Sequence, residues 1–149
     1  MSGPAQTPAA PLRVLVDTNV VLDLLLGREP WASEAQPVYA ARDAGRVELC
    51  VLASTFTDVF YIARKQVGRD RARNSIETCL QVYTILPVTR EVIERGFARA
   101  GVDFEDDVQM AVAEMERIDY LMTRNVADFT GSPAPALTPP EIAALLATP

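Results

Sequence analysis

Short apolar runs alternate with longer segments of helical spacing along most of the chain. Four runs are short and rich in branched apolar residues, which predicts buried strands of a parallel sheet: RVLVD (13–17), VELCVL (47–52), TILPV (84–88) and DYLMT (119–123). The segments between them repeat apolar residues with helical periodicity, and several end at a glycine. They cover residues 18–27, 31–44, 54–67, 69–83, 89–100 and 103–118. Near the end, Thr138 and Glu141 flank Pro139 as a capping box, which predicts a last helix.

Strands that alternate with helices predict an α/β protein in which helices cover both faces of a parallel sheet. We expect a three-layer α/β/α sandwich with a central sheet of four to five strands, the fifth being a minor edge strand within residues 131–140. Residues 13–149 are expected to form one domain. Residues 1–12 are rich in Pro and Ala without periodicity, which predicts a disordered tail. No apolar run approaches the length of about 20 residues that a membrane helix needs.

The chain contains no histidine. This absence excludes imidazole acid–base relays and Ser-His-Asp triads, so hydrolytic chemistry would have to use carboxylates, a metal ion or both. A net charge of −6 argues against a protein that holds nucleic acid through a general positive field. Cys50 and Cys79 lie in apolar segments without metal-ligand spacing, which predicts two buried thiols and a reducing cytoplasm.

Polar residues follow the predicted strands at the edge of the sheet where α/β proteins bind ligands. Asp17 interrupts the apolar run RVLVDTNVVLDLLLG, Asp58 lies one turn into the third predicted helix, and Asp106 begins the helix before DYLMT. Thr123, Asn125 and Asp128 follow that strand, and Ser54 is expected to cap the helix after VELCVL. Any one of these acids could serve only as a helix cap, as we expect for Asp103. Asp23, further along its helix, is assigned a structural role.

Together the acids indicate a cation. Two carboxylates about 5 Å apart repel each other by about 3 kcal/mol at an effective dielectric constant near 20, and a hard divalent ion removes that cost. Mg²⁺ and Mn²⁺ take oxygen ligands and bridge to phosphate oxygens. The densest basic run, RKQVGRDRAR (64–73), is expected on neighbouring helices. Acids beside basic helices therefore predict phosphodiester chemistry.

The sequence resembles the PIN-domain ribonucleases, which include the VapC-type toxins of toxin–antitoxin pairs. The resemblance spans nearly the whole chain after the tail, and it rests on the order and spacing of several motifs. These are VLVDTNVVLD, ASTFTDVFYIARK, DFEDDVQMAVAEM, DYLMTRNVADF and LTPPEI.

The resemblance implies metal ligands at Asp17, Asp106 and Asp58, with Asp128 as a further possible ligand. Asp107 is kept in reserve, because Asp106 is the acid seven residues before a small residue, Ala113. Asn19 would orient groups beside Asp17, Thr123 matches the family's hydroxyl after the fourth strand, and Asn125 and Ser54 would help to orient the site. Two departures stand out: many VapC-type toxins have glutamate in place of Asp58, and many members have an acid in place of Asn125.

The implied function is a Mg²⁺- or Mn²⁺-dependent endoribonuclease that leaves 5′-phosphate and 3′-hydroxyl ends, acts as a toxin and forms a homodimer. A small antitoxin would place its C-terminal segment in the acidic groove. Candidates for steering the RNA backbone are Arg64, Lys65, Arg69, Arg71 and Arg73, although a solvated helical face is an equal interpretation. One alternative is an inactive PIN-like module that binds protein. The other is a haloacid dehalogenase-type phosphohydrolase, which Asn19 disfavours because that mechanism needs an acid there.

Overall fold

A computed structural model describes residue 3 and residues 10–147, and its centre is a parallel sheet of five strands. The strands are β1 (Leu12–Val16), β2 (Val47–Leu52), β3 (Thr84–Leu86), β4 (Tyr120–Met122) and β5 (Ala136–Leu137). Their order across the sheet is β3-β2-β1-β4-β5, and every neighbouring pair is parallel. The predicted α/β fold is therefore confirmed, with β1 at the centre and the two-residue β5 as the minor edge strand.

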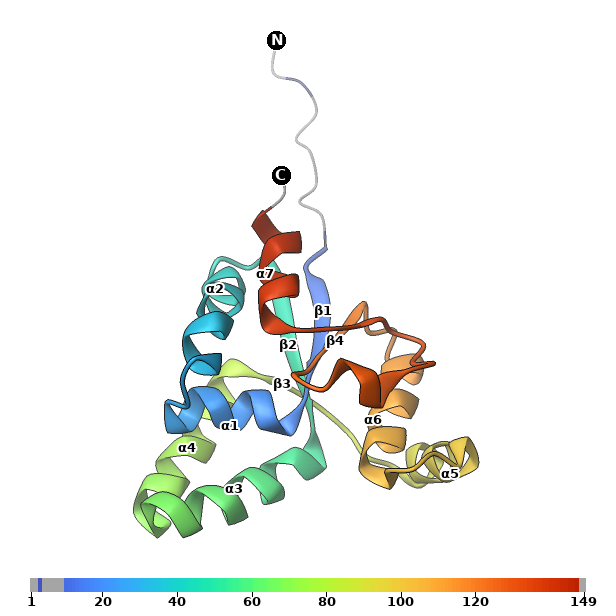
Figure 1. Cartoon of the computed structure of the whole chain (residues 1–149), viewed down its shortest axis with the longest axis horizontal. Helices are drawn as coiled ribbons and strands as arrows, with labels where there is room; N and C mark the ends of the chain where they lie inside the picture. Colours follow the sequence, from blue (N-terminus) through green and yellow to red (C-terminus); the bar gives the residue numbers. More distant parts are fainter. Residues whose placement is uncertain (1–2, 4–9, 148–149) are drawn as a thin grey trace.

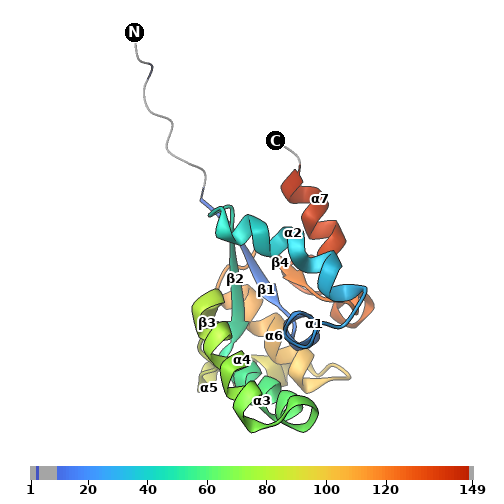
Figure 2. The same cartoon turned by 90° about the vertical axis from the view of Figure 1, so that its left-hand side faces the viewer.

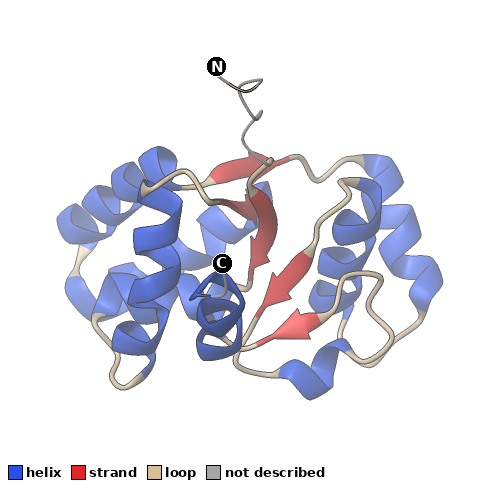
Figure 3. Cartoon of the chain, turned by 90° about the horizontal axis from the view of Figure 1, so that it is seen from above, coloured by secondary structure: helices blue, strands red, loops and turns tan. Residues whose placement is uncertain are grey.

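Helices cover both faces of this sheet (Figures 1 and 3). One layer contains α1 (Thr18–Leu26), α2 (Trp31–Asp43), α3 (Ala53–Val67), α4 (Arg69–Val82) and α7 (Pro139–Ala147). The opposite layer contains α5 (Arg90–Arg99) and α6 (Phe104–Met115). Figure 2 shows that the α3–α4 pair extends past the end of the sheet toward which β1 and β2 run. This pair is longer than a crossover between two neighbouring strands requires.

The central strand carries apolar side chains on both faces because a helix layer covers each of them. Val14 and Val16 pack in the core that includes Val20, Val38 and Ile142. Leu15 points to the opposite core, with Val108 and Val112 of α6. Cys50 and Cys79 are buried, and burial raises the pKa of each thiol to about 11. The prediction of two buried thiols is confirmed.

Local signals explain several element boundaries. Asp103 caps α6 by accepting a hydrogen bond from the Asp106 amide at 3.0 Å, as expected. Thr138 and Glu141 form the predicted capping box at the start of α7, with a 2.8 Å bond between their side chains. β3 ends at Leu86 rather than residue 88, since Pro87 cannot donate a ladder hydrogen bond.

The prediction that Ser54 caps α3 is wrong, because the helix begins at Ala53 and its cap position is Leu52, without a side-chain bond. Leu52 already has the extended backbone of a cap residue at the end of β2, so the helix starts one residue before Ser54 can act. The tail expected over residues 1–12 lies mostly outside the described residues, but its last residue, Leu12, belongs to β1 and pairs with Val47, so the domain begins one residue earlier than predicted. Among the helices that the structure describes, none is long and apolar enough to cross a membrane.

Candidate active site

Asp17 lies at the junction of the central strand and α1. Its amide donates to the Met122 carbonyl of β4 at 3.0 Å, and its own carbonyl accepts from Val20 and Val21 in the first turn of α1. The residue is only 6% exposed. The backbone is therefore fixed by two strands and a helix, and the side chain leaves the edge of the sheet in a defined direction.

The Asp17 carboxylate is held by two side chains rather than used as a helix cap. Thr123 donates its hydroxyl to one oxygen at 2.8 Å, and Gln109 donates its amide to the other at 3.1 Å. Asp17 occupies the cap position of α1, yet its side chain makes no capping hydrogen bond. Thr123 in turn accepts from the Asn125 amide at 3.0 Å. The acid that interrupts the apolar run is thus positioned by groups from α6 and from the end of β4.

A cleft of about 460 Å³ opens beside Asp17. Its walls come from the first turn of α1, the middle of α3, the start of α6 and the short helical turn η1 (Val126–Phe129). Six carboxylates line it, and within the described chain no lysine or arginine does. The acids are Asp17, Asp58, Asp103, Glu105, Asp106 and Asp128. Segments far apart in the sequence thus bring a concentrated negative charge to one place.

This concentration changes the ionisation of the acids at the start of α6. Burial, followed by the nearby carboxylates of Asp103 and Asp17, raises the pKa of Asp106 to about 7. Burial and the Asp58 carboxylate also raise the pKa of Glu105 above its ordinary value. Each charged acid disfavours ionisation of its neighbours, so a cation in the cleft would relieve a repulsion that the fold itself creates.

The donor chemistry of the cleft fits a hard divalent cation, because every charged group that lines it is a carboxylate. The carboxylates do not form a ready-made coordination shell. Within the described residues, no three side chains of His, Cys, Asp or Glu stand close enough together to hold an ion. Asp58 and Asp128 line the cleft and are exposed to solvent. The residues fit an ion that completes their arrangement when it binds.

The remaining predicted site residues fall into two groups. Asn19 and Asn125 line the cleft. Asn19 was expected to orient groups beside Asp17, but the side chains that donate hydrogen bonds to Asp17 are those of Gln109 and Thr123. Asp107 and Ser54 do not line it. Asp107 is buried and accepts a 2.8 Å hydrogen bond from the Gly101 amide, which fastens the loop before α6. Ser54 is exposed in the first turn of α3, outside the residues that line the cleft.

Asp23 has the structural role assigned to it. The side chain is 1% exposed and pairs with Arg124, with Nε at 2.7 Å and Nη2 at 3.2 Å from its two oxygens. Arg28 lies 3.8 Å away, and the Arg124 guanidinium also covers the ring of Trp31 at 4.0 Å. Arg124 follows Thr123 directly, so it lies next to the acidic cleft. Its ion pair with Asp23 neutralises this cation.

Gln109 is the site residue that sequence reasoning missed. It is 2% exposed and lies one helical turn after Asp106 on α6, within the apolar run DVQMAVA. A buried glutamine in such a run is costly without a partner, and that cost is the signal that could have identified it. Its position became informative only when the fold placed α6 against the end of β1.

On the function that the family motifs predict, a metal-dependent ribonuclease, replacing Gln109 with leucine is expected to lower RNA cleavage about 10–100-fold, the usual cost of removing a group that orients a metal ligand. Leucine fills similar space but cannot donate to Asp17. The measurement is kcat/KM with Mn²⁺, with thermal unfolding as a check on the fold. Gln109→Glu is the paired variant. It should lower kcat/KM further than Gln109→Leu does, because glutamate adds another negative charge. Full activity in Gln109→Leu would contradict the orienting role.

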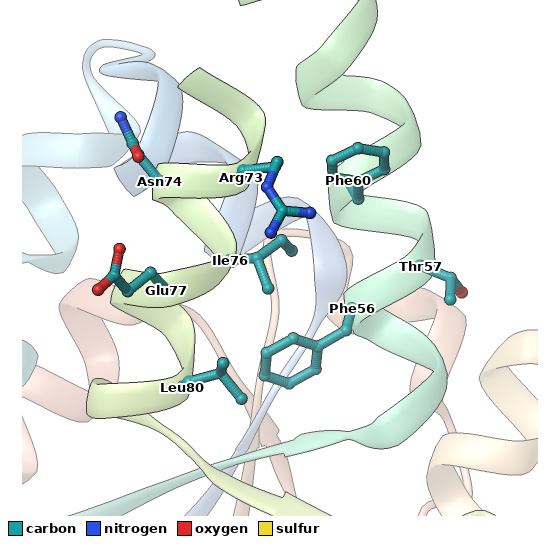
Figure 4. A pocket seen from close by; sticks show the side chains of 8 residues that line it. All are labelled: Phe56, Thr57, Phe60, Arg73, Asn74, Ile76, Glu77 and Leu80. Atoms are coloured by element: carbon teal, nitrogen blue, oxygen red, sulfur yellow. The ribbon is translucent and has the colours of Figure 1, made fainter. Parts of the chain in front are cut away.

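A second, apolar groove of about 640 Å³ lies between α3 and α4. Figure 4 shows Phe56 and Phe60 of α3 facing Ile76 and Leu80 of α4, with Arg73 among them. The other candidates for steering RNA, Arg64, Lys65, Arg69 and Arg71, are exposed around the same helix pair. Lys65 also lies 4.2 Å from the centre of the Tyr61 ring, and Tyr61 is part of the acidic cleft wall.

Comparison with known proteins agrees with this geometry. The PIN domain family model matches residues 13–127, so the chain belongs to the PIN domain family. A toxin–antitoxin complex from Klebsiella pneumoniae is similar in structure, with 27% identity, a TM-score of 0.62, and coverage of 85% of this chain and 97% of that one. A comparison with curated protein sequences found no match.

Two further solved structures share the fold at lower identity. The DNA-bound VapBC complex from Salmonella typhimurium gives a TM-score of 0.68 at 15% identity, covering 86% of this chain and 98% of that chain. VapC20 from Mycobacterium tuberculosis, a toxin that cleaves the sarcin–ricin loop, gives a TM-score of 0.60 at 15% identity. The match covers 72% of this chain and 86% of that chain. The resemblance recognised from the motifs is therefore confirmed at the level of the family.

Proposed function

We propose that this protein is a divalent-metal-dependent endoribonuclease and the toxin of a toxin–antitoxin pair. One observation carries the proposal: a buried carboxylate, fixed by two hydrogen-bond donors, opens into a cleft lined by five further acids and no basic residue of the described chain. Such a site would be unfavourable for folding alone, because it gathers like charges. It becomes favourable when a cation and a phosphate bind there.

The protein would contribute position and charge to the reaction. Thr123 and Gln109 hold Asp17 in one orientation, while Asp106 and Asp58 enter from α6 and α3. A bound Mg²⁺ or Mn²⁺ would lower the pKa of a coordinated water and offset charge that develops on the phosphate. The absence of histidine leaves the chain without the usual base for attack by the RNA 2′-hydroxyl. We therefore expect hydrolysis with 5′-phosphate products.

The test is an assay of the purified protein on single-stranded RNA with Mn²⁺, Mg²⁺ or EDTA. We expect cleavage with either ion, none with EDTA, and products that a 5′-phosphate-dependent exonuclease degrades. Equal cleavage in EDTA would contradict the metal requirement. Products ending in 2′,3′-cyclic phosphate would contradict the hydrolytic route. Cleavage of a small phosphate ester, without cleavage of RNA, would favour a phosphohydrolase.

The basic helix pair is proposed to steer the RNA backbone toward the cleft. Lys65 and Arg69 lie where α3 meets α4, and Lys65 contacts Tyr61 at the cleft wall. Replacing both by alanine should weaken RNA binding and reduce the slope of log affinity against log salt by about 1–2. The paired control is Arg42→Ala with Arg46→Ala, since neither residue lines the cleft. An unchanged slope in the first pair would contradict the steering role.

The α3–α4 groove is proposed to hold an apolar helix of the antitoxin, whose following segment would reach the acidic cleft. Support comes from the apolar lining of the groove, in which Phe56 and Phe60 are half-buried and Leu80 is exposed, and from the toxin–antitoxin complexes among the similar structures. The probe is the product of a short reading frame beside the gene. Phe60→Glu should weaken its binding by about 30-fold or more, as expected for a buried interface anchor. Unaltered binding would place the antitoxin elsewhere.

A homodimer is proposed through the exposed face of α5. Ile93 and Phe97 lie four residues apart on that helix, and Phe97 is 78% exposed. A second copy of the chain would remove this apolar surface from water. The mass in solution, measured by light scattering, should fall from dimer to monomer in Phe97→Glu, while Phe60→Glu serves as the control. A wild-type monomer would contradict the proposal.

An inactive module that binds protein remains the second candidate, because Asp58 is shorter than glutamate and Asn125 carries no charge. Both residues nevertheless line the cleft. An inactive protein has no use for Mn²⁺, so absence of Mn²⁺ binding together with retained antitoxin binding would favour this alternative.

A further inference from the structure

The acidic cleft does not end at Asp106. A second cleft of about 530 Å³ lies on the other side of this residue, between the end of α5, the start of α6 and the turn η1. The two clefts share Asp103, Asp106 and Asp128 as lining residues. Together they form one trough that crosses the start of α6. The second part has the size of pockets that hold small ligands, and a nucleotide fits that range.

Arg99 is the one basic residue that lines either part of this trough within the described chain. It is partly buried at the end of α5, and its Nη2 atom donates to the Gly131 carbonyl at 3.2 Å and to the Met110 sulfur at 3.4 Å. These contacts hold the guanidinium at the wall of the second cleft. The Arg99 side chain is therefore held against both α6 and the loop after η1.

The charge of Arg99 is not neutralised by the acids around it. Four carboxylates line the second cleft, namely those of Asp103, Asp106, Asp107 and Asp128, yet none lies within ion-pair distance of Arg99 in the described structure. Its Nε is buried, with no hydrogen-bond partner among the described residues. By contrast, Arg124 is paired with Asp23 and covers Trp31. The buried Nε cannot reach a ligand in the cleft, and Nη1 makes no hydrogen bond or ion pair among the described residues, so Nη1 is the donor of this anchored cation that is left for a ligand.

We infer that Arg99 binds a backbone phosphate of the RNA next to the bond that is cut, and that the strand runs from the Asp17 cleft across Asp106 into the second cleft. This inference rests on the proposed ribonuclease function. Repulsion from the acids would push an RNA backbone out of the trough unless cations meet its phosphates. An ion among the acids would offset the charge of one phosphate, and the guanidinium of Arg99 would meet its neighbour through a charge-assisted hydrogen bond from Nη1. Arg99 is then a binding and positioning residue outside the metal ligands.

A purely structural role for Arg99, joining α5 to the loop at Gly131, makes a different prediction. It would change thermal stability and activity on every substrate alike. A phosphate contact instead couples the arginine to the charge of one particular linkage in the RNA. The test therefore pairs a protein variant with a substrate in which a single phosphate has lost its charge.

The substrate is a short single-stranded RNA that the wild-type protein cuts at one mapped bond in Mn²⁺. Methylphosphonate linkages are placed singly at the phosphates on either side of that bond. In the wild type, one of them should lower kcat/KM about tenfold, the value of a charge-assisted hydrogen bond. Arg99→Gln, which keeps a polar amide but has no charge, should lose about tenfold on the unmodified RNA and show no further loss at that linkage. Arg95→Gln should behave like the wild type, because Arg95 is exposed and, two residues from both Ile93 and Phe97, lies on another side of α5 than these two residues.

The outcomes separate the inference from the function. If the wild type cuts no RNA in Mn²⁺, the proposed function fails and the inference fails with it. If the wild type cuts RNA but Arg99→Gln keeps the same position-dependent penalty, the phosphate contact is wrong and the nuclease stands. If Arg99→Gln does not fold, the wild type alone decides: the absence of any sensitive flanking linkage overturns the contact.

Discussion

Replacing Asp17 with asparagine is expected to lower Mn²⁺-dependent RNA cleavage by about 10³-fold, equivalent to about 4 kcal/mol of transition-state stabilisation. Asparagine retains the shape and can still exchange hydrogen bonds with Gln109 and Thr123, so the local structure should survive. It removes the charge that the other side chains of the site hold in place. The loss should appear in kcat/KM, while the free energy of unfolding changes by about 1 kcal/mol or less.

Asp43→Asn is the control for this variant. Asp43 is an exposed acid at the end of α2, and its ion pair with Arg42 lies at the surface. Its loss should leave cleavage unchanged. Retention of more than about a tenth of wild-type activity by Asp17→Asn, with its structure intact, would limit the contribution of the Asp17 charge to transition-state stabilisation to about 1.4 kcal/mol. Asp17 would then not be the central ligand.

Replacing Asp23 with alanine is expected to lower the free energy of unfolding by about 3 kcal/mol, as in other proteins where a buried ion pair loses one partner. The carboxylate is buried and accepts from Arg124, while Arg28 lies within ion-pair distance. Without it, Arg124 keeps its place over Trp31 but loses its counter-ion. Chemical denaturation, with the slope checked for constancy, measures the change.

Glu91→Ala is the matched control, because Glu91 also pairs with an arginine, Arg95, but at an exposed position on α5. Surface pairs of this kind contribute about 0.5 kcal/mol or less. If Asp23→Ala and Glu91→Ala had equal effects, burial of the Asp23 pair would have no energetic consequence. A double-mutant cycle with Arg124→Ala would then show whether the two residues are coupled at all.

The fold was accessible from the sequence because its signals are local and repeated. The apolar run before Asp17 and the run VELCVL mark strands buried on both faces, and Asp103 and Thr138 mark the helix starts. The errors lie at element ends. Ser54 is a residue type that often caps helices, but α3 begins one residue earlier, at Ala53. β3 ends before Pro87, which has no backbone N–H to donate to the sheet.

The site was accessible only in part. The family motifs predicted Asp17, Asp58 and Asp106 as site residues, and in the structure all three line one cleft. What the sequence could not indicate is which side chains touch. Gln109 and Arg99 lie on α6 and α5, and their contacts depend on how these helices meet the sheet and the turn η1. The partners of Arg124 depend in the same way on α1 and α2 packing together. Such relations come from tertiary packing, which motif spacing does not encode.

The most direct test of the account is the binding of Mn²⁺ to the purified protein, followed by electron paramagnetic resonance and calorimetry without RNA. We predict that the wild type binds Mn²⁺, that Asp17→Asn and Asp106→Asn each weaken binding by about tenfold or more, and that Asp43→Asn does not. Bound Mn²⁺ should also raise the melting temperature of the wild type. Equal binding by wild type and Asp17→Asn, or no binding by either, would contradict a metal site built around Asp17.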